Sequence, residues 1–232
     1  DSQWPSLWAE LDARRRTAQK GKGKGVGYVV DFTLSPTYAR LLNELRKRQP
    51  EAKFYLCDAT APQNGVAAQE LLGSPGTRVS VDLGDAKAIL ALDSDFLGTD
   101  PDHVRLTGEY AQNRRMETPE ADMSRLYAVE PSLTITGAQA DHRLRLRGSQ
   151  VSDFAQLLVL VLVNEKKLVP PQEAIALARN IAVPTLAPEV EKFARVVADD
   201  LLANKGRCAV LVGERQPAAV HGLGMLINEL LG

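Results

Sequence analysis

Short apolar runs alternate along this chain with longer stretches in which apolar residues recur every three or four positions. The runs predict buried β-strands, and the longer stretches predict amphipathic helices. Strands are predicted at residues 26–32, 53–58, 88–92, 126–129 and 207–213. Strands that alternate with helices are typical of a parallel sheet with helices packed on it. We therefore predict an α/β, Rossmann-like fold with a mostly parallel sheet and helices on both faces.

Apolar spacing and capping residues place the predicted helices. They are expected at residues 4–18, 35–50, 65–72, 100–115, 150–164, 172–179, 188–201 and 217–231. The second of them begins with Ser35 as N-cap and Pro36 at the first helical position. Four apolar residues form the stripe that this helix is predicted to bury: Tyr38, Leu41, Leu42 and Leu45.

The segment of residues 124–148 organises the predicted sheet. Its strand ends at a Glu130-Pro131 turn, and the loop that follows carries Thr134, Thr136 and Gly137. Loops at strand ends hold the ligand in nucleotide-binding α/β proteins. This loop is therefore a candidate binding site.

After that loop the sequence alternates between leucine and arginine, which predicts an extended strand. Its arginines project from one face: Arg143, Arg145 and Arg147. Like charges this close repel, so we expect solvent and carboxylates such as Asp141 or Asp153 to compensate them. The alternative is that the arginines dock acidic groups from elsewhere in the parent protein or from a neighbouring subunit.

Composition and charge exclude several classes of protein. The 232 residues are 44% hydrophobic and 25% charged, which is ordinary for a globular protein with a sizeable core. A net charge of −1 argues against a nucleic-acid partner. Cys57 and Cys208 match no metal-ligand spacing, and an iron–sulfur cluster would need four thiolates. The longest apolar run, residues 157–163, is far shorter than the ~20 residues that span a bilayer, so no direct membrane insertion is expected.

Two carboxylates are the main candidates for chemistry. Asp93 and Asp95 follow the strand at residues 88–92, and carboxylates at strand ends often face the ligand crevice of α/β proteins. Ordinary turn chemistry is the alternative for both. The histidines are scattered, and a structural or surface role is expected for each: His103, His142 and His221.

The glycine-rich run of residues 20–25 is the nearest approach to a phosphate-binding loop. It precedes a strand, whereas a dinucleotide fingerprint follows one and opens a helix. We therefore expect a flexible linker here. A free-standing nucleotide-binding module remains an alternative, but it lacks its fingerprint.

Four segments resemble the molybdopterin oxidoreductase family, in the same order along the chain: residues 86–95, 126–141, 146–149 and 209–226. In the family these segments carry a Gly-x-Asn-Pro crevice motif, a Val-Asp-Pro-Arg-x-Thr segment, an Arg-Pro-Gly-Thr-Asp ending, and a late strand and helix. The resemblance implies a formate dehydrogenase/DMSO reductase-type domain. It covers most of residues 1–232, which we expect to be one domain and a fragment of a longer protein. Sub-lobes at 1–150 and 151–232 are a finer division.

If the chain were part of a true molybdenum or tungsten oxidoreductase, the resemblance would place five residues around molybdopterin guanine dinucleotide: Asp93, Asp95, Thr134, Gly148 and Ser149. The departures from the family argue against that alternative. Acidic residues replace the Gly-x-Asn-Pro motif, and carboxylates would repel the cofactor's pyrophosphates. The family's metal ligand would fall near residues 57–62, where Cys57 is the weak candidate. We expect Cys57 to pack in its strand as a small buried hydrophobe.

Within the family, the chain most resembles the large iron–sulfur subunit of the bacterial alternative complex III, through residues 35–41, 92–98, 123–130, 136–142 and 213–217. That resemblance implies a domain retained without cofactor, beside the iron–sulfur domain of the parent protein and membrane subunits. It implies a quinol-oxidising complex on the periplasmic side, although no signal peptide is visible. We therefore expect a cofactor-less scaffold for electron transfer with no catalytic residue of its own, within a family of oxidoreductases.

Overall fold

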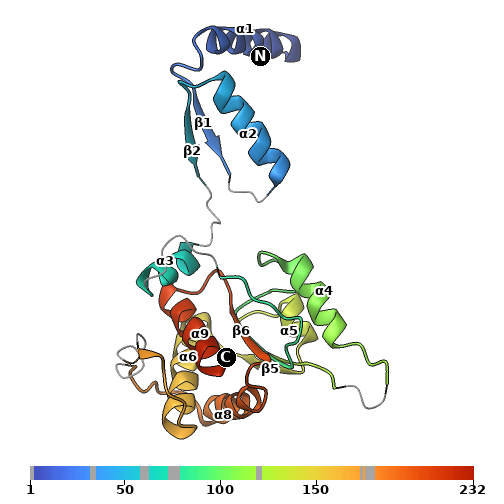
Figure 1. Ribbon diagram of the computed structural model, residues 1–232, viewed down its shortest axis with the longest axis vertical. Coiled ribbons are helices and arrows are strands. Elements are labelled where there is room, and N and C mark those ends of the chain that lie inside the picture. The colour runs from blue at the N-terminus through green and yellow to red at the C-terminus, as the bar shows by residue number, and fades with distance from the viewer. Residues whose placement is uncertain are drawn as a thin grey trace. The chain divides into compact units, whose positions relative to one another are not determined.

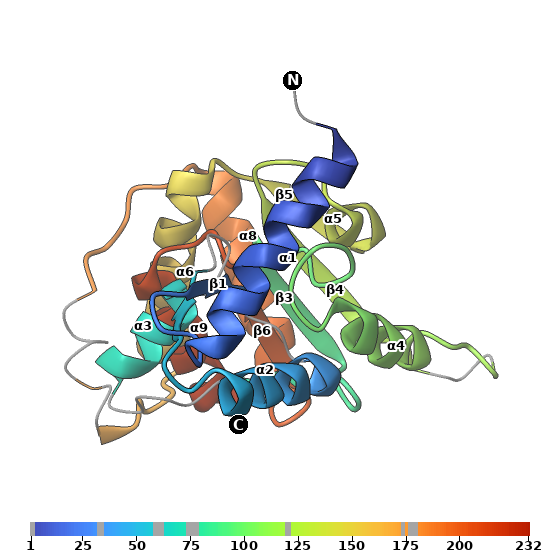
Figure 2. The same cartoon turned by 90° about the horizontal axis from the view of Figure 1, so that it is seen from above.

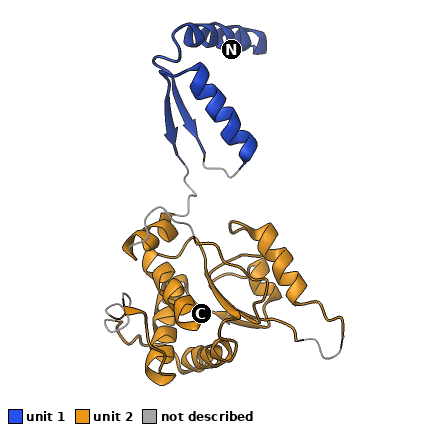
Figure 3. Ribbon diagram, in the orientation of Figure 1, with its two compact units in different colours: residues 1–61 blue, residues 62–232 orange. Residues whose placement is uncertain are grey.

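The strands that the structure describes form two parallel sheets, one in each of two compact units (Figures 1 and 3). The computed structural model describes residues 3–31, 35–57, 63–72, 79–118, 122–172, 175 and 181–232. Unit 1 comprises residues 1–61 and unit 2 comprises residues 62–232. Residue 150, where the sequence predicts two sub-lobes to meet, lies inside unit 2.

Unit 1 is a βαβ unit preceded by a long helix. Its elements are α1 (Trp4–Lys20), β1 (Gly27–Val30), α2 (Pro36–Arg48) and β2 (Lys53–Leu56). The two strands are parallel, with Gly27 opposite Lys53. The Ser35 hydroxyl accepts a hydrogen bond from the Tyr38 amide at 3.3 Å. This cap confirms the helix start predicted from Ser35 and Pro36.

The described part of unit 1 buries no hydrophobic side chain. In the stripe that α2 was expected to bury, Leu41 is 54% exposed and the other three residues are only half-buried. The predicted burial is therefore wrong. Two short strands and two helices enclose too little volume to remove such side chains from water.

Unit 2 holds a four-stranded sheet in which every strand is parallel to its neighbours. The strands are β3 (Ala88–Leu92), β4 (Arg125–Glu130), β5 (His142–Arg145) and β6 (Cys208–Val212). The predicted strands at residues 88–92, 126–129 and 207–213 are confirmed, and so is the strand of alternating leucine and arginine.

The helices described in unit 2 are α3 (Gln63–Leu71), α4 (His103–Asn113), α5 (Ile135–Gln139), η1 (Gly148–Gln150), α6 (Val151–Leu160), η2 (Val161–Glu165), α8 (Pro188–Ala203) and α9 (Ala218–Leu231). The predicted helix at residues 150–164 is realised as a 3₁₀ turn, an α-helix and a π-helical turn. The helix predicted at 172–179 lies largely outside the described residues. None of the helices in the described ranges is long and apolar enough to cross a membrane.

Helices cover both faces of the unit 2 sheet (Figure 2). Along β3, Leu90 and Leu92 pack in a core with residues of α6, α8 and α9. Ile89 packs on the opposite face with Leu106 and Tyr110 of α4. All five β3 residues are buried, as expected for a central parallel strand. The α/β fold with helices on both faces is thereby confirmed for unit 2, and it is consistent with a Rossmann-like doubly wound domain.

The strand order of this sheet is β5-β4-β3-β6. The chain runs outward from β3 to β5 and then returns to place β6 on the other side of β3. The strand order therefore reverses between β3 and β6. In open α/β sheets the ligand crevice lies at such a reversal, outside the carboxyl ends of the strands.

The backbones that leave β3 and β6 approach each other closely at this reversal. The Gly213 amide, one residue past β6, donates to the Leu92 carbonyl at 2.9 Å. A Cβ atom built on Gly213 would overlap the Asp93 carbonyl oxygen and crowd the Ser94 backbone. Backbone atoms cannot move aside as a flexible side chain can, so this position requires glycine.

Substituting Gly213 with alanine is predicted to lower the free energy of unfolding by about 3 kcal/mol or more, because the added methyl overpacks a backbone contact. Gly108 is the matched control, since it lies within α4 and its Cβ would meet open space. Gly108→Ala should stabilise the protein by roughly 0.5–1 kcal/mol through helix propensity. Urea unfolding followed by circular dichroism measures both changes. Equal effects of the two substitutions would contradict the close approach.

Candidate functional site

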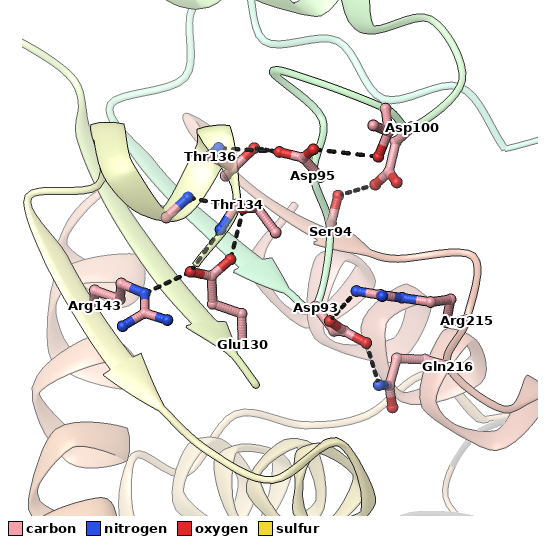
Figure 4. A network of polar contacts seen from close by, with 12 residues as sticks. Asp93, Ser94, Asp95, Asp100, Glu130, Thr134, Thr136, Arg143, Arg215 and Gln216 are labelled. Atoms are coloured by element: carbon pink, nitrogen blue, oxygen red, sulfur yellow. Dashed lines mark hydrogen bonds and ion pairs between the residues drawn. The ribbon is translucent and has the colours of Figure 1, made fainter. Parts of the chain in front are cut away.

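Three buried carboxylates gather at the carboxyl edge of the unit 2 sheet (Figure 4). Asp93 and Asp95 follow β3, and Glu130 is the last residue of β4. Their exposed fractions are only 6%, 8% and 2%. Buried carboxylates are costly unless they are paired and hydrogen-bonded. The partners of each carboxylate therefore define what this edge can do.

Asp93 connects the two strands that flank the reversal of strand order. Its Oδ1 accepts from Arg215 Nη2 at 2.9 Å, and its Oδ2 accepts from Gln216 Nε2 at 2.8 Å. Both donors lie in the loop between β6 and α9. Asp93 has a φ of 51°, a left-handed conformation that aspartate adopts more readily than most residues. This backbone turn directs its carboxylate across the crevice.

Asp95 binds the N-terminal turn of α5. Its Oδ1 accepts from the Thr136 amide at 3.0 Å and from the Thr136 hydroxyl at 3.1 Å, and its Oδ2 accepts from the Thr99 hydroxyl at 3.2 Å. Burial by itself would raise the pKa of Asp95. The hydrogen bonds from Thr136 and Thr99 outweigh burial and hold the pKa of Asp95 below its ordinary value.

Glu130 connects β4 to β5 and to the start of α5. It forms an ion pair with Arg143, and its Oε2 accepts from the Thr134 hydroxyl at 2.6 Å. Thr134 in turn caps α5, because its Oγ1 accepts from the Gly137 amide at 3.0 Å. The sequence identifies Thr134 as a candidate, and the structure places it in this network.

Each of the three acidic residues lies against a glycine. A Cβ on Gly98 would overlap the Asp95 carboxylate, and one on Gly137 would overlap the Glu130 carboxylate. Gly213 stands in the same relation to the Asp93 backbone. The glycines provide the space into which the acidic residues pack. The site is therefore built from acid–glycine pairs, which is not the arrangement of a phosphate-binding glycine loop.

The other predicted site residues lie at the margin of this edge. Gly148 and Ser149 begin η1, and a Cβ on Gly148 would lie 4.0 Å from Pro131 Cγ. Neither residue donates to or accepts from the three carboxylates in the hydrogen bonds of the described chain. The structure thus brings together Asp93, Asp95 and Thr134 and leaves the other two outside the network.

The three arginines of the predicted stripe differ in their surroundings, and Arg147 follows β5. Arg143 pairs with Glu130, whereas Arg145 and Arg147 are exposed. Asp141, expected as a partner of the stripe, instead binds Arg114 at 2.7 Å and 3.0 Å, so that expectation is wrong. The reason is the register: Asp141 precedes the strand and also accepts from the Leu126 amide.

A cavity of about 150 Å³ adjoins the acidic edge along β6. Ser94, Asp100 and His221 are among its lining residues. Burial raises the pKa of Asp100, and the negative charge of Asp95 adds to this effect. Burial lowers the pKa of His221, so both groups are shifted toward their neutral forms. His221 Nε2 is buried without a hydrogen-bond partner among the described residues.

The remaining histidines have ordinary surroundings. His103 is exposed, and its Nδ1 lies 3.1 Å from the Asp100 carbonyl oxygen. His142 stacks on Tyr127 with ring centroids 5.0 Å apart. In the ranges that the structure describes, no three His, Cys, Asp or Glu side chains are grouped so that they could hold a metal ion.

The two cysteines differ in their surroundings. Cys57 follows β2 and is exposed, so the expectation that it packs as a buried hydrophobe is wrong. β2 belongs to a two-stranded sheet, which leaves three of its four residues exposed. Cys208 at the start of β6 is half-buried, and burial, with the nearby Asp200, raises the pKa of its thiol to about 11.

Four residues of the network were not predicted as site residues: Thr99, Glu130, Arg215 and Gln216. Glu130 next to Pro131 resembles an ordinary turn. Arg215 and Gln216 lie in the loop between β6 and α9. The position of this loop directly after a predicted strand was the sequence signal that could have identified them. Because carboxyl ends of parallel strands share one edge, every loop that follows a strand can reach this site.

No protein-family model matches this chain, and no curated protein matches it either. The class of this protein is thus defined by its own fold and edge site. It is a Rossmann-like α/β domain in which acidic side chains of the chain itself bond across the crevice at the carboxyl ends of the strands.

Replacing Asp95 with asparagine is predicted to lower the free energy of unfolding at pH 7 by about 1–3 kcal/mol, because charge-assisted hydrogen bonds are lost. The folded-state pKa is depressed, so this contribution exists above the unfolded pKa of ~3.9 and disappears as pH falls through the folded pKa. The difference between wild type and variant should therefore shrink below about pH 4. Denaturant unfolding at several pH values measures it, with exposed Glu117→Gln as a control that changes little. A pH-independent difference would contradict the assignment.

The two thiols should react with an alkylating reagent at different rates. Cys57 is exposed, whereas Cys208 is half-buried and its raised pKa leaves little thiolate at pH 8. Mass spectrometry after brief treatment with iodoacetamide should find label at Cys57 well before Cys208. Cys57→Ser should change the free energy of unfolding by less than about 0.5 kcal/mol. Faster labelling of Cys208 would refute this arrangement.

Proposed function

We propose that this chain is a molybdopterin-oxidoreductase-like scaffold domain of a quinol-oxidising electron-transfer complex and that it works without the family's cofactor. The observation that carries the proposal is the Asp93 carboxylate, which binds Arg215 and Gln216 across the reversal of strand order. In doubly wound proteins a dinucleotide binds at that position. Here side chains of the chain itself bridge it.

The acidic edge does not fit molybdopterin guanine dinucleotide. The cofactor carries two pyrophosphate groups, and the buried carboxylates of Asp93, Asp95 and Glu130 would repel them. The donors that could have held a phosphate are also engaged, because the Thr136 amide and hydroxyl both donate to Asp95. No reaction step is therefore assigned to the cofactor in this chain.

The same bonds give the edge a structural role. Asp93 fixes the loop after β6, Asp95 fixes α5, and Glu130 joins β4 to β5. Each bond connects residues that lie in, or directly follow, different strands. Together they cross-link the carboxyl edge of the sheet, which suits a domain that supports redox groups carried elsewhere.

The resemblance to the large iron–sulfur subunit of alternative complex III supports the choice of partners. We expect the iron–sulfur domain of the parent protein and the membrane subunits of its complex to be neighbours of this formate dehydrogenase/DMSO reductase-type domain, on the periplasmic side. Electron transfer would occur in those partners. The contribution of this chain would be their placement, with no catalytic residue of its own.

Protein purified from a bacterium that makes molybdopterin cofactors is predicted to contain far less than one equivalent of molybdenum, tungsten or pterin. Plasma mass spectrometry measures the metals, and the fluorescence of an oxidised extract measures the pterin. A molybdenum enzyme purified from the same cells is the positive control. Stoichiometric metal together with pterin would overturn the proposal in favour of a fragment of a true oxidoreductase.

Two further measurements separate the remaining alternatives. Calorimetric titration with GDP should give no binding heat, and clear binding would favour a nucleotide-binding module. Affinity purification from detergent-solubilised membranes of the native host should recover the chain with iron–sulfur signals in electron paramagnetic resonance. Recovery without such signals would contradict the role in an electron-transfer complex.

A further inference from the structure

Helix α1 presents an apolar stripe that the described part of unit 1 leaves uncovered. Trp4, Leu7, Trp8 and Leu11 are 70%, 41%, 61% and 46% exposed, respectively. Their spacing of three and four residues places all of them on one face of the first two turns. The two tryptophan rings stack with centroids 6.2 Å apart. No residue of α1 is buried, so the stripe is continuous and accessible.

Positive charge follows this stripe directly. Residues 14–24 contain six Lys or Arg side chains, and α1 has two acidic residues, whereas the whole chain carries a net charge of −1. Glu10 pairs with Arg14 at 2.7 Å, and Asp12 pairs with Arg15 at 3.1 Å. The other four cations have no acidic partner in the described chain: Arg16, Lys20, Lys22 and Lys24. The cations are thus concentrated at the carboxyl end of the helix and in the turn after it.

We propose that α1 lies flat on a bilayer surface that contains anionic lipid. Trp4, Leu7, Trp8 and Leu11 enter the boundary between headgroups and acyl chains, and the cluster of four cations binds the headgroups. Tryptophan suits this boundary because its ring is apolar and its N–H is polar. A helix that combines such a face with adjacent cations binds anionic membranes in the plane of the interface.

The length of α1 and the position of its charges favour this occupant over others. The helix has 17 residues and an apolar stripe of only two turns, so it can lie on a bilayer but not span it. A purely apolar groove would bind the stripe but leave the four cations without partners, whereas an anionic bilayer offers an apolar interior for the stripe and negative headgroups for the cations. The proposal concerns α1 in unit 1 and does not depend on the scaffold function proposed above, which is argued from the carboxylates of unit 2.

The tryptophan fluorescence of the chain, excited selectively over tyrosine, reports on α1 alone, because its two tryptophans are Trp4 and Trp8. Addition of vesicles of phosphatidylcholine mixed with phosphatidylglycerol should shift the emission to the blue. The protein should also sediment with these vesicles at least about tenfold more tightly than with pure phosphatidylcholine. High salt should weaken the binding, because the headgroup attraction is screened.

Matched variants separate the stripe and the cation cluster from general surface effects. Trp4→Ala/Trp8→Ala should abolish sedimentation with mixed vesicles, whereas Val104→Ala/Leu133→Ala, at two other exposed apolar positions, should not change it. Lys20→Gln/Lys24→Gln should weaken binding about tenfold or more. Arg145→Gln/Arg147→Gln removes the same charge elsewhere on the surface and should have little effect. Circular dichroism verifies the fold of each variant.

Three outcomes would overturn the proposal. The first is equal binding by wild type and the tryptophan variant. The second is emission that is already blue-shifted in lipid-free monomer, which would mean that the rest of the chain covers the stripe. The third is a lipid-independent dimer, detected by light scattering and lost in the tryptophan variant. That result would identify a second copy as the occupant.

Discussion

Compensation of buried negative charge at the carboxyl edge of the unit 2 sheet is the constraint on which the rest of this domain depends. Three carboxylates leave water at the ends of neighbouring strands, and each must recover in hydrogen bonds what it loses in hydration. The geometry of the loops follows from that requirement. Asp93 adopts a left-handed backbone to reach Arg215, Thr134 caps α5 while it binds Glu130, and the β5 register places Arg143 where Glu130 needs it.

The two units differ in how much hydrophobic surface they bury. Unit 2 buries both faces of its sheet and places its three buried carboxylates at the carboxyl edge, outside the two hydrophobic clusters. The described part of unit 1 has more polar helices, and it contains no buried hydrophobic side chain. Little of its apolar surface is removed from water, and burial of such surface is the main favourable term in folding. Contacts of its exposed apolar side chains with other surfaces would therefore contribute a large share of any hydrophobic stabilisation it gains.

The fold of unit 2 could be predicted from the sequence because its strands are buried on both faces and its helices are amphipathic. The position of Asp93, Asp95 and Thr134 at one edge also followed, since parallel strands end together. The bonds that define the edge did not follow. Asp93 and Arg215 are separated by more than half of the chain, and a turn containing Glu130 and Pro131 gives no sign of an ion pair. Burial in unit 1 was predicted wrongly because apolar spacing identifies a face of a helix but not what covers it.

The pairing of acidic residues with glycines constrains the order in which this edge can change over generations. A side chain gained at Gly137 while Glu130 is present would collide with the carboxylate, and a collision of the same kind follows at Gly98 while Asp95 is present. If the acid is replaced first by a smaller residue, the vacated space accommodates the new side chain. A route that avoids the collision therefore begins with loss of the acid, at the cost of its hydrogen bonds, and changes the glycine second. The two positions of each acid–glycine pair therefore diverge in a fixed order.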